Sequence, residues 1–298
     1  MHSVRLWWAA ARPFSFTASV IPVLVGTLLA AEDEFRWWAA VLALVGSVLI
    51  HAGTNFINDY YDWRKGADNE TSLGPAGFIQ RGLVKPAAIR NAGIISFAAG
   101  AIIGLVLCQL TSWELLWLGL ASVLAGFLYT GAPIHLAYIG LGEITVFLFM
   151  GPVMVMGAYF VQTETWAWDP FLVSLPIAFL VTAILHANNL RDIDSDRATG
   201  KRTIATLIGR KWANREMYVL LAGAYVSLVV AALTGALPWP ALIALATLPA
   251  AVPIVKVVAA GGNPRKLNFA LIGCARLHMR FGALMSVGLL FSLAFNAR

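Results

Sequence analysis

Residues 37–68 read WWAAVLALVGSVLIHAGTNFINDYYDWRKGAD, an apolar run that ends in a cluster of amide and carboxylate side chains. The part from Trp37 to Phe56 contains no lysine, arginine, aspartate or glutamate. A helix of this length is long enough to cross the hydrocarbon core of a bilayer, which is about 30 Å thick. The stretch therefore predicts a membrane-spanning helix with carboxylates at one of its ends.

Eight further apolar runs of similar length predict eight further spans. Each must be a helix, because an open sheet would leave unpaired backbone groups in lipid. The sequence thus predicts an all-α integral membrane protein with nine transmembrane helices. The additional runs are Phe14 to Ala31, Ala88 to Leu107, Trp113 to Tyr129, Glu143 to Val161, Phe171 to Asn189, Met217 to Leu233, Pro240 to Val258 and Leu277 to Phe295.

The composition excludes a soluble domain. Of the 298 residues, 59% are hydrophobic and 12% are charged, and the mean hydropathy is +0.76. Such values belong to proteins that reside in a bilayer. We interpret the run from Phe14 as a retained first helix and not as a signal peptide, because acidic residues and no small-residue cleavage site follow it. One membrane-embedded domain, 1–298, is expected.

The two cysteines indicate neither a disulfide framework nor a thiolate metal site. Cys108 and Cys274 fall in segments that the helix count puts at opposite ends of the membrane. Both are expected to be small buried residues.

The basic residues predict the topology. With nine helices, nineteen of the twenty-one lysines and arginines fall on one side, and only Arg36 and Arg298 fall on the other. Because basic residues near helix ends are retained in the cytoplasm, the amino terminus is expected inside and the carboxyl terminus outside, in a multi-pass protein of the inner cell membrane. The net charge of +6 is explained by this retention and by anionic lipid, so no nucleic-acid partner is expected.

Two clusters at helix ends on the predicted cytoplasmic side have helical spacing. Asn55, Asp59 and Asp62 stand at i, i+4 and i+7, and so lie on one helix face. Asn189, Asp192 and Asp196 stand at i, i+3 and i+7, which also predicts one helix face, whereas Asp194 has another phase. Six of the nine acidic residues on that side fall in the two segments 55–68 and 188–196, which ordinary solvated loop charges would not require.

The ligand chemistry of these clusters favours Mg²⁺ and a phosphorylated substrate. Converging carboxylates repel one another unless a cation lies between them. Ligands that are all oxygen atoms suit Mg²⁺, which completes its shell with water and substrate phosphate. Nearby basic side chains are expected to neutralise the remaining diphosphate oxygens; these are Lys65, Arg81, Lys201 and Arg202.

Other polar residues have a structural alternative beside the functional one. Tyr129, before the turn Gly131-Ala132-Pro133, would donate to a leaving phosphate or offer its ring to a cation, or would only anchor the helix at the interface. His51 and His186 are expected to be hydrogen-bonded pocket histidines and not metal ligands. Arg276 and Arg280 are read as retention charges, with a place in the site as the alternative.

The motifs resemble the UbiA superfamily of intramembrane prenyltransferases, and within it the branch that prenylates 1,4-dihydroxy-2-naphthoate in menaquinone synthesis. The likeness rests on NDYYDWRKGAD, which begins at Asn58, on LAYIGLGE from Leu136 and on HANNLRDIDSDRATGKRT from His186. It implies catalytic and metal-binding roles for Asp59, Asp62, Asp68, Asp192 and Asp196, with Tyr129 beside them. It also implies substrate-binding roles for Asn55, Asn58, Lys65, Arg81, Asn188, Asn189, Lys201, Arg202 and Arg12. The resemblance also includes the motif LGP, Leu73 to Pro75, after which an arginine is expected in many relatives, whereas this chain has Ala76-Gly77.

The resemblance implies a nine-helix bundle around a central cavity, closed by aspartate-rich cytoplasmic loops at about 58–87 and 189–215. The expected reaction transfers a polyprenyl group from prenyl diphosphate to dihydroxynaphthoate with decarboxylation, gives demethylmenaquinone and requires Mg²⁺. A superfamily member with another aromatic or isoprenoid acceptor is the first alternative. A transporter is the distant one, because its acidic residues would lie at mid-membrane.

Overall fold

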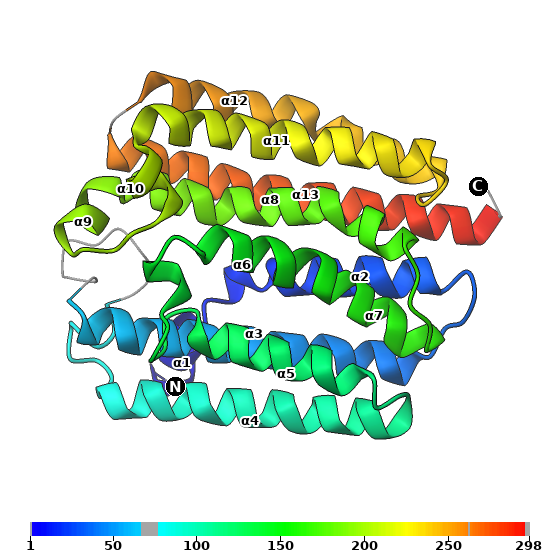
Figure 1. Cartoon of the computed structure of the whole chain (residues 1–298), viewed down its shortest axis with the longest axis horizontal. Helices are drawn as coiled ribbons and strands as arrows, with labels where there is room; N and C mark the ends of the chain where they lie inside the picture. The colour runs from blue at the N-terminus through cyan, green and yellow to red at the C-terminus, as the bar shows by residue number, and fades with distance from the viewer. Residues whose placement is uncertain (1, 67–76, 262, 296–298) are drawn as a thin grey trace.

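The computed structural model describes residues 2–66, 77–261 and 263–295, and it is a bundle of helices that run side by side (Figure 1). Within these ranges there is no strand beyond an isolated bridge between Ile139 and Arg202. In chain order the elements are α1 His2–Ala10, η1 Pro13–Ser15, α2 Thr17–Ala30, α3 Trp37–Arg64, α4 Pro86–Leu110, α5 Leu115–Leu128, η2 Leu136–Tyr138, α6 Gly142–Leu148, η3 Phe149–Val153, α7 Met154–Thr163, α8 Asp169–Arg191, α9 Ile193–Ala198, α10 Ile204–Ile208, α11 Arg210–Leu233, η4 Trp239–Thr247, α12 Leu248–Ala260 and α13 Pro264–Phe295.

The all-α membrane fold is confirmed. Among the described residues, eight helices are long and apolar enough to span a bilayer. The remaining predicted span, Trp113 to Tyr129, corresponds to the shorter apolar helix α5, which has 14 residues. At a rise of 1.5 Å per residue such a helix is about 21 Å long, which is shorter than a hydrocarbon core of about 30 Å.

Two helix boundaries differ from the sequence prediction in ways that matter for the site. Helix α3 continues to Arg64, so Asn58, Asp59 and Asp62 lie on its last turns and not in the loop expected from residue 58. Helix α13 begins at Pro264 and not at Leu277, because proline at the first position starts a helix well. Arg276 and Arg280 therefore lie 12 and 16 residues beyond the start of the last helix, and not near its start as the sequence predicted.

One predicted span is a helix with an internal break. The run from Glu143 to Val161 forms α6, a π-helical turn η3 and α7. Pro152 lies in this turn, and proline lacks the N–H that a regular α-helix would use. Gly151 in the same turn packs so tightly that an added Cβ would lie 2.3 Å from that of Ala178 on α8. The break allows α6 and α7 to follow α8 closely.

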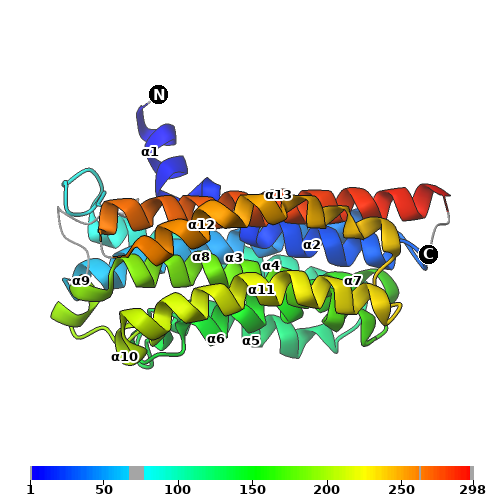
Figure 2. The same cartoon turned by 90° about the horizontal axis from the view of Figure 1, so that it is seen from above.

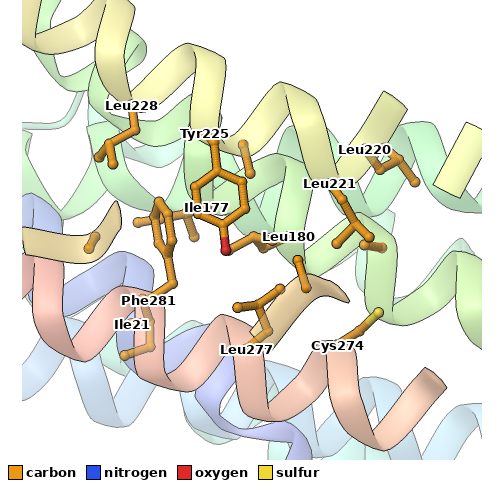
Figure 3. Packing of buried hydrophobic residues seen from close by; sticks show 14 of the residues in the cluster. Ile21, Ile177, Leu180, Leu220, Leu221, Tyr225, Leu228, Cys274, Leu277 and Phe281 are labelled. Atoms are coloured by element: carbon orange, nitrogen blue, oxygen red, sulfur yellow. The ribbon is translucent and has the colours of Figure 1, made fainter. Parts of the chain in front are cut away.

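The largest hydrophobic core joins α8, α11, α12 and α13 with α2 (Figure 3). Leu180, Leu228 and Phe281 are almost fully buried in it, and the Tyr225 hydroxyl lies 3.1 Å from Thr247 Oγ1. On the other side of the bundle α3 and α4 meet through paired glycines, since a Cβ on Gly93 would lie 2.8 Å from Ile57 Cγ1. Small residues let membrane helices approach in this way.

Both predicted aspartate motifs come to the same end of the bundle, which we call the aspartate end. Helices α3 and α8 both finish there, and the loop that contains α9 and α10 lies beside them (Figure 1). Helix α1 also lies toward this end and projects sideways from the bundle (Figure 2). Phe295, at the end of α13, lies at the opposite end (Figure 1).

Candidate active site

A cavity of about 1080 Å³ opens near the aspartate end and extends deep into the bundle. It lies among α2, α3, α4, α5, the α6–α7 pair, α8 and α13. On α3 its lining runs from Leu42 to Asn58, a length of about 24 Å at 1.5 Å per residue. Polar side chains concentrate near the aspartate end, whereas the deeper wall is apolar; it includes Ile103, Leu107, Leu115 and Leu118.

The first aspartate cluster lies where η1 meets the end of α3. Asp59 is buried and forms an ion pair with Arg12. Arg12 has a φ of 59°, a left-handed conformation that is uncommon outside glycine and that turns the chain from α1 into η1. Asn55 donates from Nδ2 to Ala11 O at 3.0 Å and to Ser15 Oγ at 3.2 Å. Arg12, Asn55 and Asn58 all line the cavity.

The second cluster lies at the end of α8 and in α9. Asp192 accepts hydrogen bonds from Arg191, 2.7 Å from Nε and 2.5 Å from Nη2. The same guanidinium donates to Asn188 Oδ1 at 2.8 Å and to Asn268 Oδ1 at 2.9 Å. Asn188 and Arg191 line the cavity, so this face of α8 points into it.

Asp196 is a buried carboxylate with one oxygen free of hydrogen bonds, as a cation ligand would be. It is buried, and its Oδ2 has no hydrogen-bond partner among the described residues. Lys201 Nζ is 3.6 Å from Oδ1. Burial raises the pKa of Asp196 to about 6; the charges of Asp192 and Asp62 act in the same direction, and Lys201 opposes them. The charge of Asp62 in the first cluster therefore affects the pKa of Asp196 in the second cluster.

Tyr138 connects the two clusters directly. Its hydroxyl donates to Asp62 Oδ1 at 2.6 Å, and its ring lies 3.9 Å from Lys65 Nζ and 5.5 Å from Lys201 Nζ. Its carbonyl accepts a hydrogen bond from the backbone N–H of Arg202 at 3.2 Å. The segment around η2 therefore ties the end of α3 to the loop after α9.

The two asparagines on α8 have different environments. Asn188 faces the cavity, whereas Asn189 is buried and donates from Nδ2 to Glu143 Oε1 at 2.8 Å. His186 lies behind them, with Nδ1 3.6 Å from Glu143 Oε1 and 3.6 Å from Glu216 Oε2. Its Nε2 is 2.7 Å from Ala213 O, so that nitrogen donates. This buried group holds α8 against α6 and α11.

The structure brings together most, but not all, of the predicted site residues. Tyr129 lines the cavity. His51 forms hydrogen bonds with the hydroxyls of Ser15 and Ser19, as expected for a pocket histidine. Arg81 is exposed and makes no hydrogen bond or ion pair with either cluster in the described part of the chain. The Arg202 side chain is also exposed. Asp68 lies outside the described residues.

Three residues at the site were missed by the sequence reasoning. Tyr138 and Glu143 lie in the motif LAYIGLGE, and Arg191 lies between Asn189 and Asp192. Their position in these motifs was the available signal. Tyr138 and Glu143 have partners far away in sequence, so only the fold identifies which of the two nearby tyrosines, Tyr129 or Tyr138, contacts an aspartate.

The donor set suits a cation that arrives with its substrate. Within the described ranges no three histidine, cysteine, aspartate or glutamate side chains form a metal-binding group by themselves. Asp59, Asp62 and Asp192 each have a protein partner, and Asp196 retains a buried oxygen without one. Mg²⁺ is commonly held by one or two carboxylates together with water and substrate phosphates. The residues present fit such a shared site.

Comparison with known proteins matches residues 19–279 to the model of the UbiA prenyltransferase family. The chain belongs to the UbiA prenyltransferase family. It is therefore an enzyme that transfers prenyl groups, and it is a multi-pass membrane protein.

Curated relatives extend over nearly the whole chain. This chain is 37% identical to the 1,4-dihydroxy-2-naphthoate octaprenyltransferase of Bacillus subtilis, over 97% of this chain and 93% of that protein. The protein with the same name in Mycobacterium tuberculosis is 34% identical, over 90% of each. These names support a prenyltransferase of the menaquinone type.

Solved structures of the UbiA family share the fold. A UbiA homolog from Aeropyrum pernix has a TM-score of 0.71 at 18% identity, over 93% of this chain and 98% of that one. A UbiA homolog from Archaeoglobus fulgidus bound to DMAPP and Mg²⁺ has a TM-score of 0.59 at 15% identity, over 97% of this chain and 98% of that one.

Proposed function

We propose that this UbiA-family enzyme transfers a polyprenyl group from prenyl diphosphate to 1,4-dihydroxy-2-naphthoate, with loss of the acceptor's carboxylate, to give demethylmenaquinone. One observation carries the proposal: the aspartate-bearing ends of α3 and α8 lie at one end of the bundle, and Asn58 and Asn188 from the same two helix ends line a long, largely apolar cavity. That arrangement suits a substrate with an anionic head and a hydrocarbon tail. The names of the curated relatives support the choice of acceptor.

In this proposal Asp59, Asp62, Asp192 and Asp196 hold Mg²⁺ together with the diphosphate, and Asp68 joins them from outside the described residues. The metal supplies positive charge that offsets the charge developing on the diphosphate as the carbon–oxygen bond breaks. Lys65 and Lys201 add cationic charge beside Asp62 and Asp196. Arg202 closes over the diphosphate from its exposed position beside Tyr138.

The cavity wall has the remaining roles. Asn58 and Asn188 orient the diphosphate from α3 and α8, and Asn55 and Arg12 fix the end of α1 beside them. Tyr129 offers its ring and hydroxyl to the allylic carbon and the leaving group. The apolar lining excludes water, which would otherwise capture the allylic cation. Arg81 is exposed, and its proposed role stays that of a diphosphate ligand.

The orientation follows the same reasoning. The aspartate end faces the cytoplasm, because the loops at that end carry most of the basic residues. The amino terminus is then inside and the carboxyl terminus outside the inner cell membrane.

The test is product analysis with the purified, detergent-solubilised chain. Mass spectrometry should find prenylated, decarboxylated naphthoquinol when prenyl diphosphate, dihydroxynaphthoate and Mg²⁺ are supplied together, and none when Mg²⁺ is chelated. Asp62→Ala and Asp192→Ala should abolish turnover without loss of folded protein. A product formed with another aromatic acceptor, and not with dihydroxynaphthoate, would favour the alternative superfamily activity. Diphosphate release that needs neither Mg²⁺ nor the aspartates would refute the mechanism.

A further inference from the structure

One stripe of α13 lines the cavity. Asn268, Leu271, Ile272, Ala275, Arg276 and Met279 recur at three- and four-residue spacing and all belong to the cavity wall. Between Asn268 and Met279 the only charged member of this stripe is Arg276. A charged side chain on a membrane-spanning helix is costly in lipid, so it indicates a functional partner.

The depth of Arg276 follows from contacts on either side of it. Asn268 accepts a hydrogen bond from Arg191, so it is level with the second aspartate cluster. Arg276 is eight residues further along α13, a distance of about 12 Å at 1.5 Å per residue. Gly282, six residues deeper, packs on Ile21 of α2. Helices α2 and α13 run in the same direction (Figure 1). Counting six residues back from the contact of Gly282 with Ile21 on each helix puts Arg276 level with the segment around Ser15.

This level of the cavity is polar on two sides. Across from Arg276, Ser15 Oγ accepts a hydrogen bond from Asn55 and lies 3.2 Å from His51 Nε2. Asn55, Ser15 and His51 line the cavity as well. Below them the lining is apolar, and above them lie the aspartate clusters. The polar level is therefore between the expected positions of the diphosphate and of the prenyl tail.

Arg276 differs from the other two arginines on the cavity wall. Arg12 is paired with Asp59, and Arg191 is paired with Asp192. Arg276 makes no hydrogen bond or ion pair with any residue in the described part of the chain. Its guanidinium carries a full charge and a fork of donors that matches a carboxylate.

The geometry points to Arg276 as the residue that binds the carboxylate of the aromatic acceptor. This inference rests on the proposed function. The acceptor ring must lie next to the first carbon of the prenyl group, on the cavity side of the diphosphate. That is the level of Arg276, and the hydroxyls of the acceptor then face Ser15, His51 and Asn55. An arginine–carboxylate pair forms two parallel charge-assisted hydrogen bonds, which are stronger than hydrogen bonds between neutral groups.

The inference has a kinetic signature. Arg276 contacts the carboxylate in the bound acceptor, before any charge develops on the diphosphate, so its contribution is chiefly to acceptor binding. Arg276→Ala should raise KM for dihydroxynaphthoate on the order of 10- to 100-fold, as expected for loss of a charged hydrogen bond. KM for prenyl diphosphate should stay within about twofold, and Arg276→Lys should recover part of the loss.

A direct binding experiment isolates the carboxylate. The fluorescence of 1-hydroxy-2-naphthoate and of 1-naphthol is titrated with the full-length protein in detergent, in the wild type, Arg276→Ala and Arg280→Ala. Arg280 is the matched control, since it is, like Arg276, an exposed arginine, and it lies one turn further along α13 but is absent from the described cavity wall. The acid should bind about tenfold or more weakly to Arg276→Ala only, and 1-naphthol should bind equally to all three.

Several results would overturn the assignment. Unchanged binding of the acid to Arg276→Ala would do so, as would equal weakening for the acid and for 1-naphthol, which indicates a general change of cavity shape. A raised KM for prenyl diphosphate in place of the acceptor would assign Arg276 to the diphosphate. Absence of product from the wild type with dihydroxynaphthoate would refute the proposed function, whereas the titration would still decide whether Arg276 selects a carboxylate.

Discussion

Removing one hydroxyl group, in Tyr138→Phe, should weaken catalysis by disturbing Asp62. The Tyr138 hydroxyl donates to the buried Asp62 carboxylate at 2.6 Å. Hydrogen bonds to charged groups contribute about 1.5–3 kcal/mol, and the lower value applies here because the aspartate end is open to water. The phenylalanine ring preserves the contacts of Lys65 and Lys201 with the aromatic face. The substitution therefore tests the hydroxyl alone.

The expected loss is about tenfold in kcat/KM for prenyl diphosphate, which corresponds to ~1.4 kcal/mol. It is measured with saturating acceptor and Mg²⁺ in detergent, by the release of inorganic diphosphate. Tyr138→Leu also removes the ring and should cost a further factor of about two to five, since exposed cation–π contacts contribute ~0.5–1 kcal/mol.

Tyr60→Phe is the matched control, because Tyr60 lies on the same turn of α3 as Asp59 and its hydroxyl donates to no residue in the described part of the chain. It should retain activity near that of the wild type. Equal kcat/KM for Tyr138→Phe and wild type would refute the reasoning, because the Asp62 carboxylate would then need no support from η2.

Three further results are expected. Gly119 lines the cavity and has no atom within 4 Å of an added Cβ, so Gly119→Phe should shift the product, by mass spectrometry, toward shorter prenyl chains; an undiminished yield with the longest donor would contradict this. The pKa of Asp196 is raised from 3.8 to about 6, so its ionised form costs stability increasingly as pH rises through that range. Mg²⁺ binds the ionised carboxylate, which is the main form of Asp196 at about pH 7.5 but not at about pH 5.5. The rise in Tm on adding Mg²⁺ and diphosphate should therefore be larger at about pH 7.5, and Asp196→Asn should reduce the difference between the two pH values. A reporter fused after Arg298 should be external, and a reporter inserted near Lys201 should be cytoplasmic. If both reporters were on the same side, the chain would cross the membrane an even number of times between Lys201 and Arg298, and the predicted topology would be wrong.

The positions of the aspartates on their helices were readable from the sequence. The spacing i, i+4 and i+7 gives one helix face, and Asp59 and Asp62 indeed lie close together at the end of α3. The rotation of a helix about its axis depends on its neighbours. On α8 that rotation turns Asn188 into the cavity and Asn189 toward Glu143. Spacing alone did not distinguish these two residues.

The boundaries of α13 show a second limit. Hydropathy locates the most apolar part of a helix, so the prediction began at Leu277, after the basic residues. The helix itself begins at Pro264, because backbone hydrogen bonding continues through polar residues that face a cavity and need not meet lipid. Arg276 was consequently placed near the start of the last helix and interpreted as a retention charge, although it lies on the cavity wall.

The sequence by itself determined that this protein is a helical membrane protein with two aspartate motifs at helix ends, because hydrophobic length and residue spacing are local properties. The predicted single face of the second motif was wrong, since α8 ends at Arg191 and a new helix, α9, begins at Ile193. Only the tertiary structure decided that Tyr138 joins the motifs, that Glu143 supports Asn189 and that Arg276 faces the cavity. Each of these depends on which helices pack together and at what rotation. That choice is made by contacts between residues far apart in the chain, such as Gly282 with Ile21.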